Sequence, residues 1–361
     1  MSKFQIGLLG ALMAVSVNWR AYADHESLKV VPSAYGIYHG AFPDFWEGSM
    51  LGLNNKVLEL EAKLNKKLGI VTFNNDWVDG PLFPWDAVDQ IAGMDRVLLI
   101  RILPRSTRTQ DSGGDYVYNL NSFLRGDHDF RLREWARAAK ASATPLMVEW
   151  APEANGRWYP WNGLWNGAGN TMGYGDPTIP DGPERYRDVF RRVVDIFNYE
   201  GVTNVTWVFH VDSQPQPQEA WNSMAAYYPG DQYVDWLGLS VFGAQFPWQY
   251  WDSFANVLEH SYLEFAALSQ TKPLAISEFG VIEDPYDANR KTQWINEALS
   301  TLLDERFNRI KFISYWHESS WIPSHQNNLR IDSSAQSLAT YRNLINRPEF
   351  LSDVEVTWPH S

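Results

Sequence analysis

The sequence predicts a single eight-stranded (β/α)8 TIM barrel of the α/β class. Eight short apolar segments alternate with amphipathic helical segments, and neighbouring parallel strands need such crossovers. The 361 residues suit one barrel domain with its loops. Apolar residues make up 45% of the chain and charged residues 20%, which is enough to build a large core. A doubly wound open sheet is the alternative arrangement of the same elements.

The predicted strands are short and rich in β-branched and aromatic residues. They are Ala34–His39, Gly69–Phe73, Val97–Leu103, Pro145–Val148, Val205–Phe209, Val234–Phe242, Pro273–Phe279 and Ile310–Trp316. The helices are expected at Leu53–Lys67, Phe130–Ser142, Pro183–Tyr199, Tyr250–Leu268, Asn289–Leu303 and Ala335–Ile345. Between the second and third strands we expect a loop that carries Trp77 and Trp85.

Residues 1–23 have the pattern of a secretory signal peptide. Lys3 precedes an apolar run from Ile6 to Val17, and Ala21-Tyr22-Ala23 fits a cleavage site. A membrane anchor is the rival interpretation, but the run is short for a bilayer. We therefore expect an exported protein, periplasmic or extracellular, whose residues 24–361 form the barrel domain.

Charge and cysteine content narrow the possible partners. The 43 acidic and 30 basic residues give a net charge of −13, which disfavours nucleic acid and anionic membranes. The chain has no cysteine, so disulfides, a thiol nucleophile and thiolate metal sites are excluded. No histidine pair has zinc spacing, and neither a dinucleotide loop nor a Gly-x-Ser-x-Gly elbow follows a strand. We expect no metal, no cofactor and a monomer.

The stretch after the fourth predicted strand combines acidic, amide and aromatic side chains. Glu153, Asn155 and Arg157 occur there among four large rings, which are Trp150, Trp158, Tyr159 and Trp161. Sugars stack their CH faces on aromatic rings and bond their hydroxyls to charged or amide groups, so this composition is typical of carbohydrate binding. The alternative is an aromatic loop that only packs on the barrel rim.

A second carboxylate occupies a matching position. Glu278 ends the seventh predicted strand, and Glu153 lies just past the fourth. Side chains at the carboxyl ends of barrel strands converge on one face, so the two carboxylates are expected to face each other across the axis. A separation of about 5 to 5.5 Å would make a retaining glycosidase, and a wider one an inverting glycosidase.

Three segments resemble glycoside hydrolase family 26. They are Glu153–Trp161 (EANGRWYPW), Tyr227–Asp235 (YYPGDQYVD) and Ile276–Gly280 (ISEFG). The resemblance extends from about Tyr35 to Arg342. It implies a (β/α)8 barrel without a metal, and endo-acting, retaining cleavage of β-linked polysaccharides, most often β-mannan. It further implies that Glu153 is the acid/base and Glu278 the nucleophile.

The same resemblance assigns substrate contacts and exposes departures from the family pattern. Trp158 would line the site near the acid/base, and Trp316 would be the floor of the subsite that holds the attacked sugar. Pro152 stands where family mannanases usually have a histidine, and Ser240 and Phe242 stand where they have an aspartate and a tyrosine. A minority branch that cuts mixed-linkage β-1,3-1,4-glucan shows similar replacements. The substrate therefore stays open between β-mannan and this glucan.

Further side chains are candidates for sugar contacts because they follow predicted strands. For these the alternatives are rim packing for the tryptophans and a buried, hydrogen-bonded ring for the histidines. They are His39, His210, His317, Trp46, Trp77, Trp85, Trp161, Trp165, Trp248 and Trp321. Asn155 is expected to shape the turn rather than to touch sugar.

The sequence thus predicts an exported glycoside hydrolase that hydrolyses internal β-1,4 linkages of a polysaccharide. A non-catalytic sugar-binding barrel is one alternative, because Pro152, Ser240 and Phe242 depart from the family pattern. A transglycosylase or an enzyme that trims the cell's own exopolysaccharide is another.

Overall fold

Eight parallel strands close into a barrel, because the first of them, β2, pairs both with its neighbour in sequence and with the last, β9. The computed structural model describes residues 28–45, 52–109, 111, 113–319 and 327–357. The barrel strands are β2 (Ile37–Pro43), β3 (Ile70–Asp76), β4 (Val97–Leu103), β5 (Leu146–Trp150), β6 (Val205–Asp212), β7 (Trp236–Phe242), β8 (Leu274–Gly280) and β9 (Ile310–His317). The predicted (β/α)8 fold is therefore confirmed.

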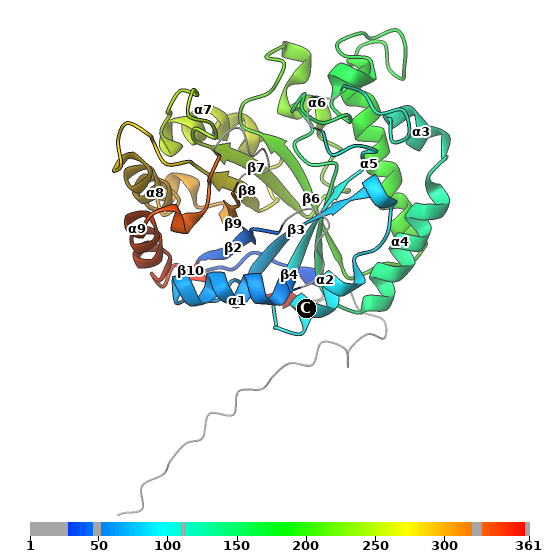
Figure 1. Ribbon diagram of the computed structural model, residues 1–361. Helices are drawn as coiled ribbons and strands as arrows, with labels where there is room; N and C mark the ends of the chain where they lie inside the picture. Colours follow the sequence, from blue (N-terminus) through cyan, green and yellow to red (C-terminus); the bar gives the residue numbers. More distant parts are fainter. Residues whose placement is uncertain (1–27, 46–51, 110, 112, 320–326, 358–361) are drawn as a thin grey trace, which may run out of the picture.

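Helices surround this barrel and connect consecutive strands (Figure 1). They are α1 (Leu53–Leu64), α2 (Trp85–Ala92), α3 (Leu120–Arg125), α4 (Asp129–Ser142), α5 (Asp181–Tyr199), α6 (Met224–Tyr227), α7 (Phe254–Ala267), α8 (Arg290–Thr301) and α9 (Ala335–Ile345). Side-chain caps fix the starts of α3, α7 and α9, where Asn119, Ser253 and Ser334 accept from the amides of Ser122, Asn256 and Ser337. None of the helices in the described part of the chain is long and apolar enough to cross a membrane.

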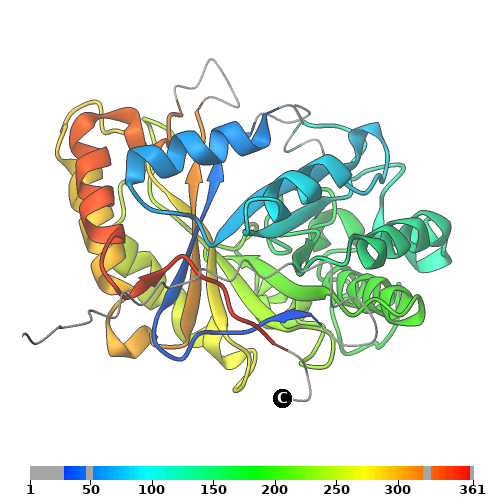
Figure 2. The ribbon, with the colours of Figure 1, turned by 90° about the horizontal axis from the view of Figure 1, so that it is seen from below.

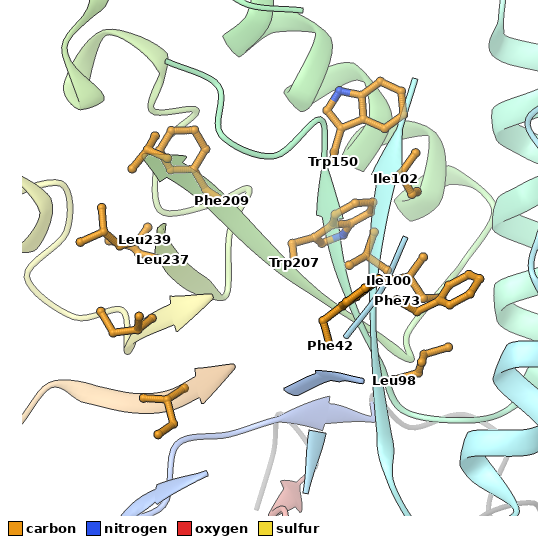
Figure 3. Packing of buried hydrophobic residues seen from close by; sticks show 14 of the residues in the cluster. Phe42, Phe73, Leu98, Ile100, Ile102, Trp150, Trp207, Phe209, Leu237 and Leu239 are labelled. Carbon is orange, nitrogen blue, oxygen red and sulfur yellow. The ribbon is translucent and has the colours of Figure 1, made fainter. Parts of the chain in front are cut away.

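The core forms two layers because strand side chains alternate between the two faces of the sheet. In β4, Leu98, Ile100 and Ile102 point outward and pack under the helices together with side chains such as Phe73 and Trp150 (Figure 3). The alternate residues of the strands point into the barrel and form a smaller apolar cluster, which includes Val97, Leu99, Met147, Val208 and Phe312. Helix packing and barrel filling are thus built from opposite faces of the same strands.

A small two-stranded sheet lies below the amino-terminal end of the barrel (Figure 2). It pairs β1 (Lys29–Val30) with β11 (Val356–Thr357), and β10 (Phe350–Leu351) adds to the edge of β2. Val30 and Val356 pack against the apolar barrel cluster. This end of the barrel is therefore covered by the two ends of the described chain.

Three parts of the prediction need correction or lie outside the description. The segment around Trp85 is a helix, α2, rather than a loop; its eight residues are too few for a clear periodicity. The first strand runs to Pro43, because Gly40 lets the neighbouring strand approach where a side chain would meet the Ile70 carbonyl oxygen. The proposed signal peptide, residues 1–23, lies outside the described residues.

Candidate active site

Glu153 is presented by a strained turn at the carboxyl end of β5. The strand ends at Trp150, and Ala151 and Glu153 follow with φ of +47° and +52°, a region that L residues seldom adopt. The Asn155 side chain holds the turn, because its amide donates to the Asp212 carbonyl (2.8 Å) and its oxygen accepts from the Asp212 amide (2.7 Å). Asn155 therefore shapes the turn, as the sequence predicted.

Two donors hold the Glu153 carboxylate, which is only 6% exposed. The indole Nε1 of Trp158 donates to Oε2 at 2.8 Å, and the Ser240 hydroxyl donates to Oε1 at 2.6 Å. Trp158 reaches it from the loop five residues further on, and Ser240 from β7. These bonds fix the orientation of the carboxylate toward the barrel axis.

Glu278 lies in β8, next to Ser240 in the register of β7 and β8, and is 4% exposed. Its Oε1 forms an ion pair with Nη2 of Arg101. Arg101 is fixed in turn by Glu149, which accepts from its Nε at 3.2 Å, and by Asn74, which accepts from Nη1 at 3.1 Å. A buried guanidinium thus holds the second carboxylate from β4.

The structure brings the two predicted catalytic carboxylates together. One carboxylate oxygen of Glu153, one of Glu278 and one ring nitrogen of His210 all lie within 4.8 Å of one another. Such a trio has ligand types that a metal ion uses, but Glu149 and Ser240 occupy both ring nitrogens of His210, which leaves neither free for coordination. The arrangement therefore fits a pair of reacting carboxyl groups better than a metal centre.

His210 and Ser240 lie behind the carboxylates and are fully buried. The His210 Nδ1 is 2.9 Å from Oε2 of Glu149, and its Nε2 is 2.8 Å from the Ser240 hydroxyl. Ser240 in turn contacts Glu153. The sequence predicted both as substrate contacts, whereas the structure uses their polar atoms to hold Glu153.

The carboxyl groups of this site influence one another's ionisation. Burial raises the pKa of Glu278 well above its usual range; the Arg101 guanidinium opposes this rise, and the Glu153 charge adds to it. Burial and the Glu153 charge likewise raise the pKa of Asp212, which also shares a side-chain hydrogen bond with Glu153. For Glu149, the His210 and Arg101 charges outweigh the opposing effect of burial, and its pKa is lowered. The ionised form of Glu149 is therefore favoured.

Two aromatic side chains lie at the carboxyl ends of β9 and β7, the end of the barrel that carries the carboxylates. Trp316 stacks on Phe42 with ring centroids 4.1 Å apart, and the Arg101 guanidinium carbon is 5.1 Å from the Trp316 ring centroid. Its Nε1 donates to Glu318 at 2.9 Å, which fixes the ring. Phe242 packs with Trp316 against one small apolar cluster, so both partly exposed rings lie on the same side of the site.

Three predicted sugar contacts are not brought to the site. His39 is fully buried and bonds the Tyr341 hydroxyl of α9, outside the barrel wall. Trp77 is 1% exposed and packs on Trp150 and Phe123. Trp161 is also fully buried and donates to the Pro152 carbonyl. Their positions near strand ends suggested a role in sugar binding, but their rings are buried in the protein core.

The remaining candidates are exposed on the surface, buried in the core or outside the described residues. Trp85, Trp165 and Trp248 are exposed on the surface, and His317 is buried, with its Nδ1 accepting from the Ile331 amide. Trp46 and Trp321 lie outside the described residues.

Sequence reasoning missed three charged residues of the site, which are Arg101, Glu149 and Asp212. Each lies in a strand whose other residues are almost all apolar: VLLIRIL, LMVEW and VTWVFHVD. A lone charge in a fully buried strand needs a partner, because burying it unpaired is costly. A single charged residue in an apolar strand was therefore the sequence signal that could have identified all three site residues.

Comparison with known proteins relates this chain to a described family. A profile of the family described as Glycosyl hydrolase family 26 matches residues 111–305, more than half of the chain. The chain is 31% identical over 233 residues to Endoglucanase H from Acetivibrio thermocellus; the match covers 64% of this chain but only 23% of that protein. The chain thus spans about a quarter of the length of this relative.

Solved structures with the same fold include two mannanases. A GH26 β-mannanase from Bacteroides ovatus superposes with a TM-score of 0.60 at 16% identity, over 88% of this chain and 90% of that chain. The catalytic domain of a GH26 endo-β-1,4-mannanase from Bacillus sp. JAMB-750 gives a TM-score of 0.66 at 15% identity, over 91% and 95%. At such identities the likeness concerns the fold. The match of the family profile over more than half of the chain shows that this chain belongs to glycosyl hydrolase family 26, a family of glycoside hydrolases.

Proposed function

We propose that this protein is a retaining endo-β-glycanase that hydrolyses internal β-1,4 linkages of a β-polysaccharide. The observation that carries the proposal is the approach of Glu153 and Glu278, whose nearest carboxylate oxygens lie within 4.8 Å. Retaining glycosidases hold their carboxyl groups about 5 to 5.5 Å apart, whereas inverting enzymes leave about 6.5 to 9.5 Å for a water molecule. The short separation therefore favours double displacement.

Glu278 is assigned as the nucleophile. Its carboxylate attacks the anomeric carbon, forms a covalent glycosyl ester and displaces the leaving sugar oxygen. The contact with Arg101 supports this role, because a guanidinium stays charged at all relevant pH values and favours the ionised carboxylate beside it. Arg101 also orients the attacking oxygen through its own bonds to Glu149 and Asn74.

Glu153 is assigned as the acid/base. It gives its proton to the leaving oxygen in the first step and, as a carboxylate, takes a proton from water when the ester is hydrolysed. The hydrogen bond between Asp212 and Glu153 supports this role, because burial and the Glu153 charge raise the pKa of Asp212 and so favour a proton within this pair. Glu278 is therefore paired with Arg101. The proton needed for acid catalysis is assigned to Glu153, on the other side of the site from this ion pair.

Trp316 and Trp158 are the proposed sugar contacts, with Phe242 beside Trp316. The Trp316 ring is held by stacking on Phe42 and by its bond to Glu318, which suits a rigid stacking platform for a pyranose. Trp158 donates to Glu153 itself, so a sugar near its indole would also be near the acid proton. The buried side chains of His39, Trp77 and Trp161 have no part in this proposal.

The proposed substrate is mixed-linkage β-1,3-1,4-glucan, with β-mannan as the second candidate. The relative at 31% identity is named as an endoglucanase, whereas the matched mannanases are about half as similar in sequence. Ser240 and Phe242, in place of the aspartate and tyrosine that the family's mannanases usually carry, point the same way. We further propose that residues 24–361 act outside the cytoplasm after removal of residues 1–23.

A polysaccharide panel tests the proposal. Purified protein is incubated with barley β-glucan, β-mannan, xylan and β-1,3-glucan, and reducing ends are measured together with product sizes. We expect rapid release of oligosaccharides from β-glucan, and loss of at least about 10³-fold in the Glu153→Ala and Glu278→Ala variants. Azide should restore activity to one or both with an activated aryl glycoside.

The panel also separates the alternatives. A non-catalytic barrel would retard in a gel that contains polysaccharide but release no sugar, and that result would refute the proposal. A transglycosylase would produce longer oligosaccharides when an acceptor sugar is added. Full activity in either alanine variant would refute the role given to that residue.

A further inference from the structure

A continuous chain of hydrogen bonds runs from the barrel wall to the proposed acid/base. It begins at Glu149 in β5, passes through His210 in β6 and Ser240 in β7, and ends on Glu153. The three links measure 2.9, 2.8 and 2.6 Å. Glu149, His210 and Ser240 are all fully buried, so water does not compete for these bonds. The substrate chemistry described above leaves this chain without a role.

The direction of the bonds follows from the donors available. Glu149 is an anion because its ion pair with Arg101 favours the charged form, so Nδ1 of His210 carries the hydrogen that lies between Glu149 and His210. In a neutral imidazole, Nε2 is then an acceptor. Ser240 has one hydroxyl hydrogen and two neighbours, His210 and Glu153, so it can donate to only one of them at a time.

We propose that Ser240, held in place by His210 and Glu149, is a positioning residue whose hydroxyl turns between His210 and Glu153 as Glu153 alternates between acid and base. This inference rests on the proposed function, because it assigns a task to the acid/base that function requires. It concerns residues that touch the acid/base rather than the sugar.

Each half of the reaction uses one position of the hydroxyl. While Glu153 carries its proton, Ser240 donates to Nε2 of His210. When that proton passes to the leaving sugar oxygen, Glu153 becomes a carboxylate, and the Ser240 hydroxyl turns to donate to Oε1. When Glu153 then takes a proton from the attacking water, the hydroxyl turns back. No proton leaves Ser240 or His210, and only the orientation of one O–H bond changes.

Other charged and titratable groups around Glu153 do not offer this adjustment. Glu278 is held in an ion pair with Arg101, and Asp212 shares a hydrogen bond with Glu153 but has no second partner of the kind that Ser240 has in His210. Tyr159 also lies close enough to feel the charges of Arg101, Glu153 and Glu278, and burial raises its pKa, so it stays neutral. A hydroxyl is a neutral group that both donates and accepts, and it therefore suits both states of the carboxyl.

The test compares two substrates in the Ser240→Ala variant. Hydrolysis of polysaccharide needs a protonated Glu153, whereas a 2,4-dinitrophenyl glycoside of the matching disaccharide has a leaving group that needs no acid. We expect kcat/KM for the polysaccharide to fall about 10- to 100-fold, and kcat/KM for the aryl glycoside to stay within about threefold. The Ser240 hydroxyl stabilises the carboxylate form of Glu153, so its removal makes loss of the Glu153 proton harder. The alkaline limb of the pH profile of kcat/KM for polysaccharide should therefore move up by about half a pH unit.

Two further variants guard against a merely structural effect. Ser240→Thr keeps the hydroxyl and should recover most of the polysaccharide activity. His210→Leu removes the second partner of Ser240 and should show the same selective loss as Ser240→Ala, with thermal melting confirming the fold of each.

Equal losses on both substrates in Ser240→Ala would overturn the proposal, because they would place the defect at Glu278, which neighbours Ser240 in the sheet. An unshifted alkaline limb would also overturn it. Failure of the proposed function is a different result, since the wild-type protein would then cleave neither substrate.

Discussion

The two ends of the barrel interior are built from the same strands but carry opposite chemistry. At the amino-terminal end the inward side chains are apolar, for example Leu99 in β4 and Met147 in β5. Two residues further along the same strands, Arg101 and Glu149 point to the same interior and form an ion pair. A spacing of two residues along each strand thus separates the apolar core from the charged site.

The difference shows how stability and chemistry are divided in this fold. The apolar end is covered by β1 and β11 and contributes burial of large side chains. The polar end buries four carboxyl groups against one guanidinium and one imidazole, which are Glu149, Glu153, Asp212, Glu278, Arg101 and His210. Burial of charges costs free energy. We therefore expect substitutions at the two ends to affect different measurements.

The largest effect is expected for Glu278→Ala. Loss of the proposed nucleophile should lower kcat by at least about 10³-fold, because no covalent intermediate can form. Arg101 keeps its bonds to Glu149 and Asn74, so the fold should persist. Kinetics on β-glucan and circular dichroism measure the two quantities. The matched control is Glu259→Gln, an exposed glutamate of α7, which should retain full activity.

At the opposite end, Leu99→Ala should destabilise the protein without changing its chemistry. Leu99 is fully buried, and truncation of such a side chain costs about 2 to 5 kcal/mol through lost burial and a cavity. Urea unfolding measures this loss, while kcat at 25 °C should stay within about twofold. Leu58→Ala, at a half-exposed position of α1, should cost under about 0.5 kcal/mol. A large loss of kcat in Leu99→Ala would contradict the claim that the apolar end contributes stability and the polar end catalysis.

Arg101→Met tests the charge that holds Glu278. The guanidinium lowers the pKa of Glu278, so its removal should raise that pKa and move the acidic limb of the pH profile to higher pH. We also expect kcat/KM to fall about 100-fold at neutral pH, because the nucleophile is less ionised and less well oriented. Arg101→Lys keeps a charge and should shift the limb less. An acidic limb that does not move in Arg101→Met would contradict the role of this ion pair.

His39→Gln should change the pH dependence of stability and leave activity intact. Burial lowers the pKa of His39 to about 3, so between pH 6.5 and 5 the unfolded chain binds a proton that the native state does not. This residue should therefore remove about 2 kcal/mol of unfolding free energy over that interval. His317, with a pKa lowered by burial to about 3, adds a similar loss. Urea unfolding at both pH values should show a smaller drop in the variant than in the wild type.

The fold was predictable because each barrel strand carries a continuous apolar signal that burial on both faces requires. Boundaries were predicted less well where small residues carry the strand. Gly40 and Ala41 lie inside β2, where close approach of the neighbouring strand, rather than side-chain propensity, decides the structure. The short pairings of β1 and β11 depend on contacts between the two ends of the chain, which no local pattern reveals.

The candidate site was predicted only in part. The positions of Glu153 and Glu278 at strand ends implied their convergence, because barrel geometry brings such residues together. The same rule misplaced His39 and Trp77, because a residue near a strand end can point outward as well as inward. The side chains behind the carboxylates, Arg101 foremost, were missed because their partners come from other strands.

The stereochemistry of hydrolysis tests the pairing of the two carboxylates most directly. Proton NMR follows the anomeric signal of the first product released from β-glucan, before mutarotation mixes the anomers. Carboxylates within 4.8 Å predict that the β-anomer appears first. Initial appearance of the α-anomer would mean direct attack by water and would contradict the assignment of Glu278 as a nucleophile.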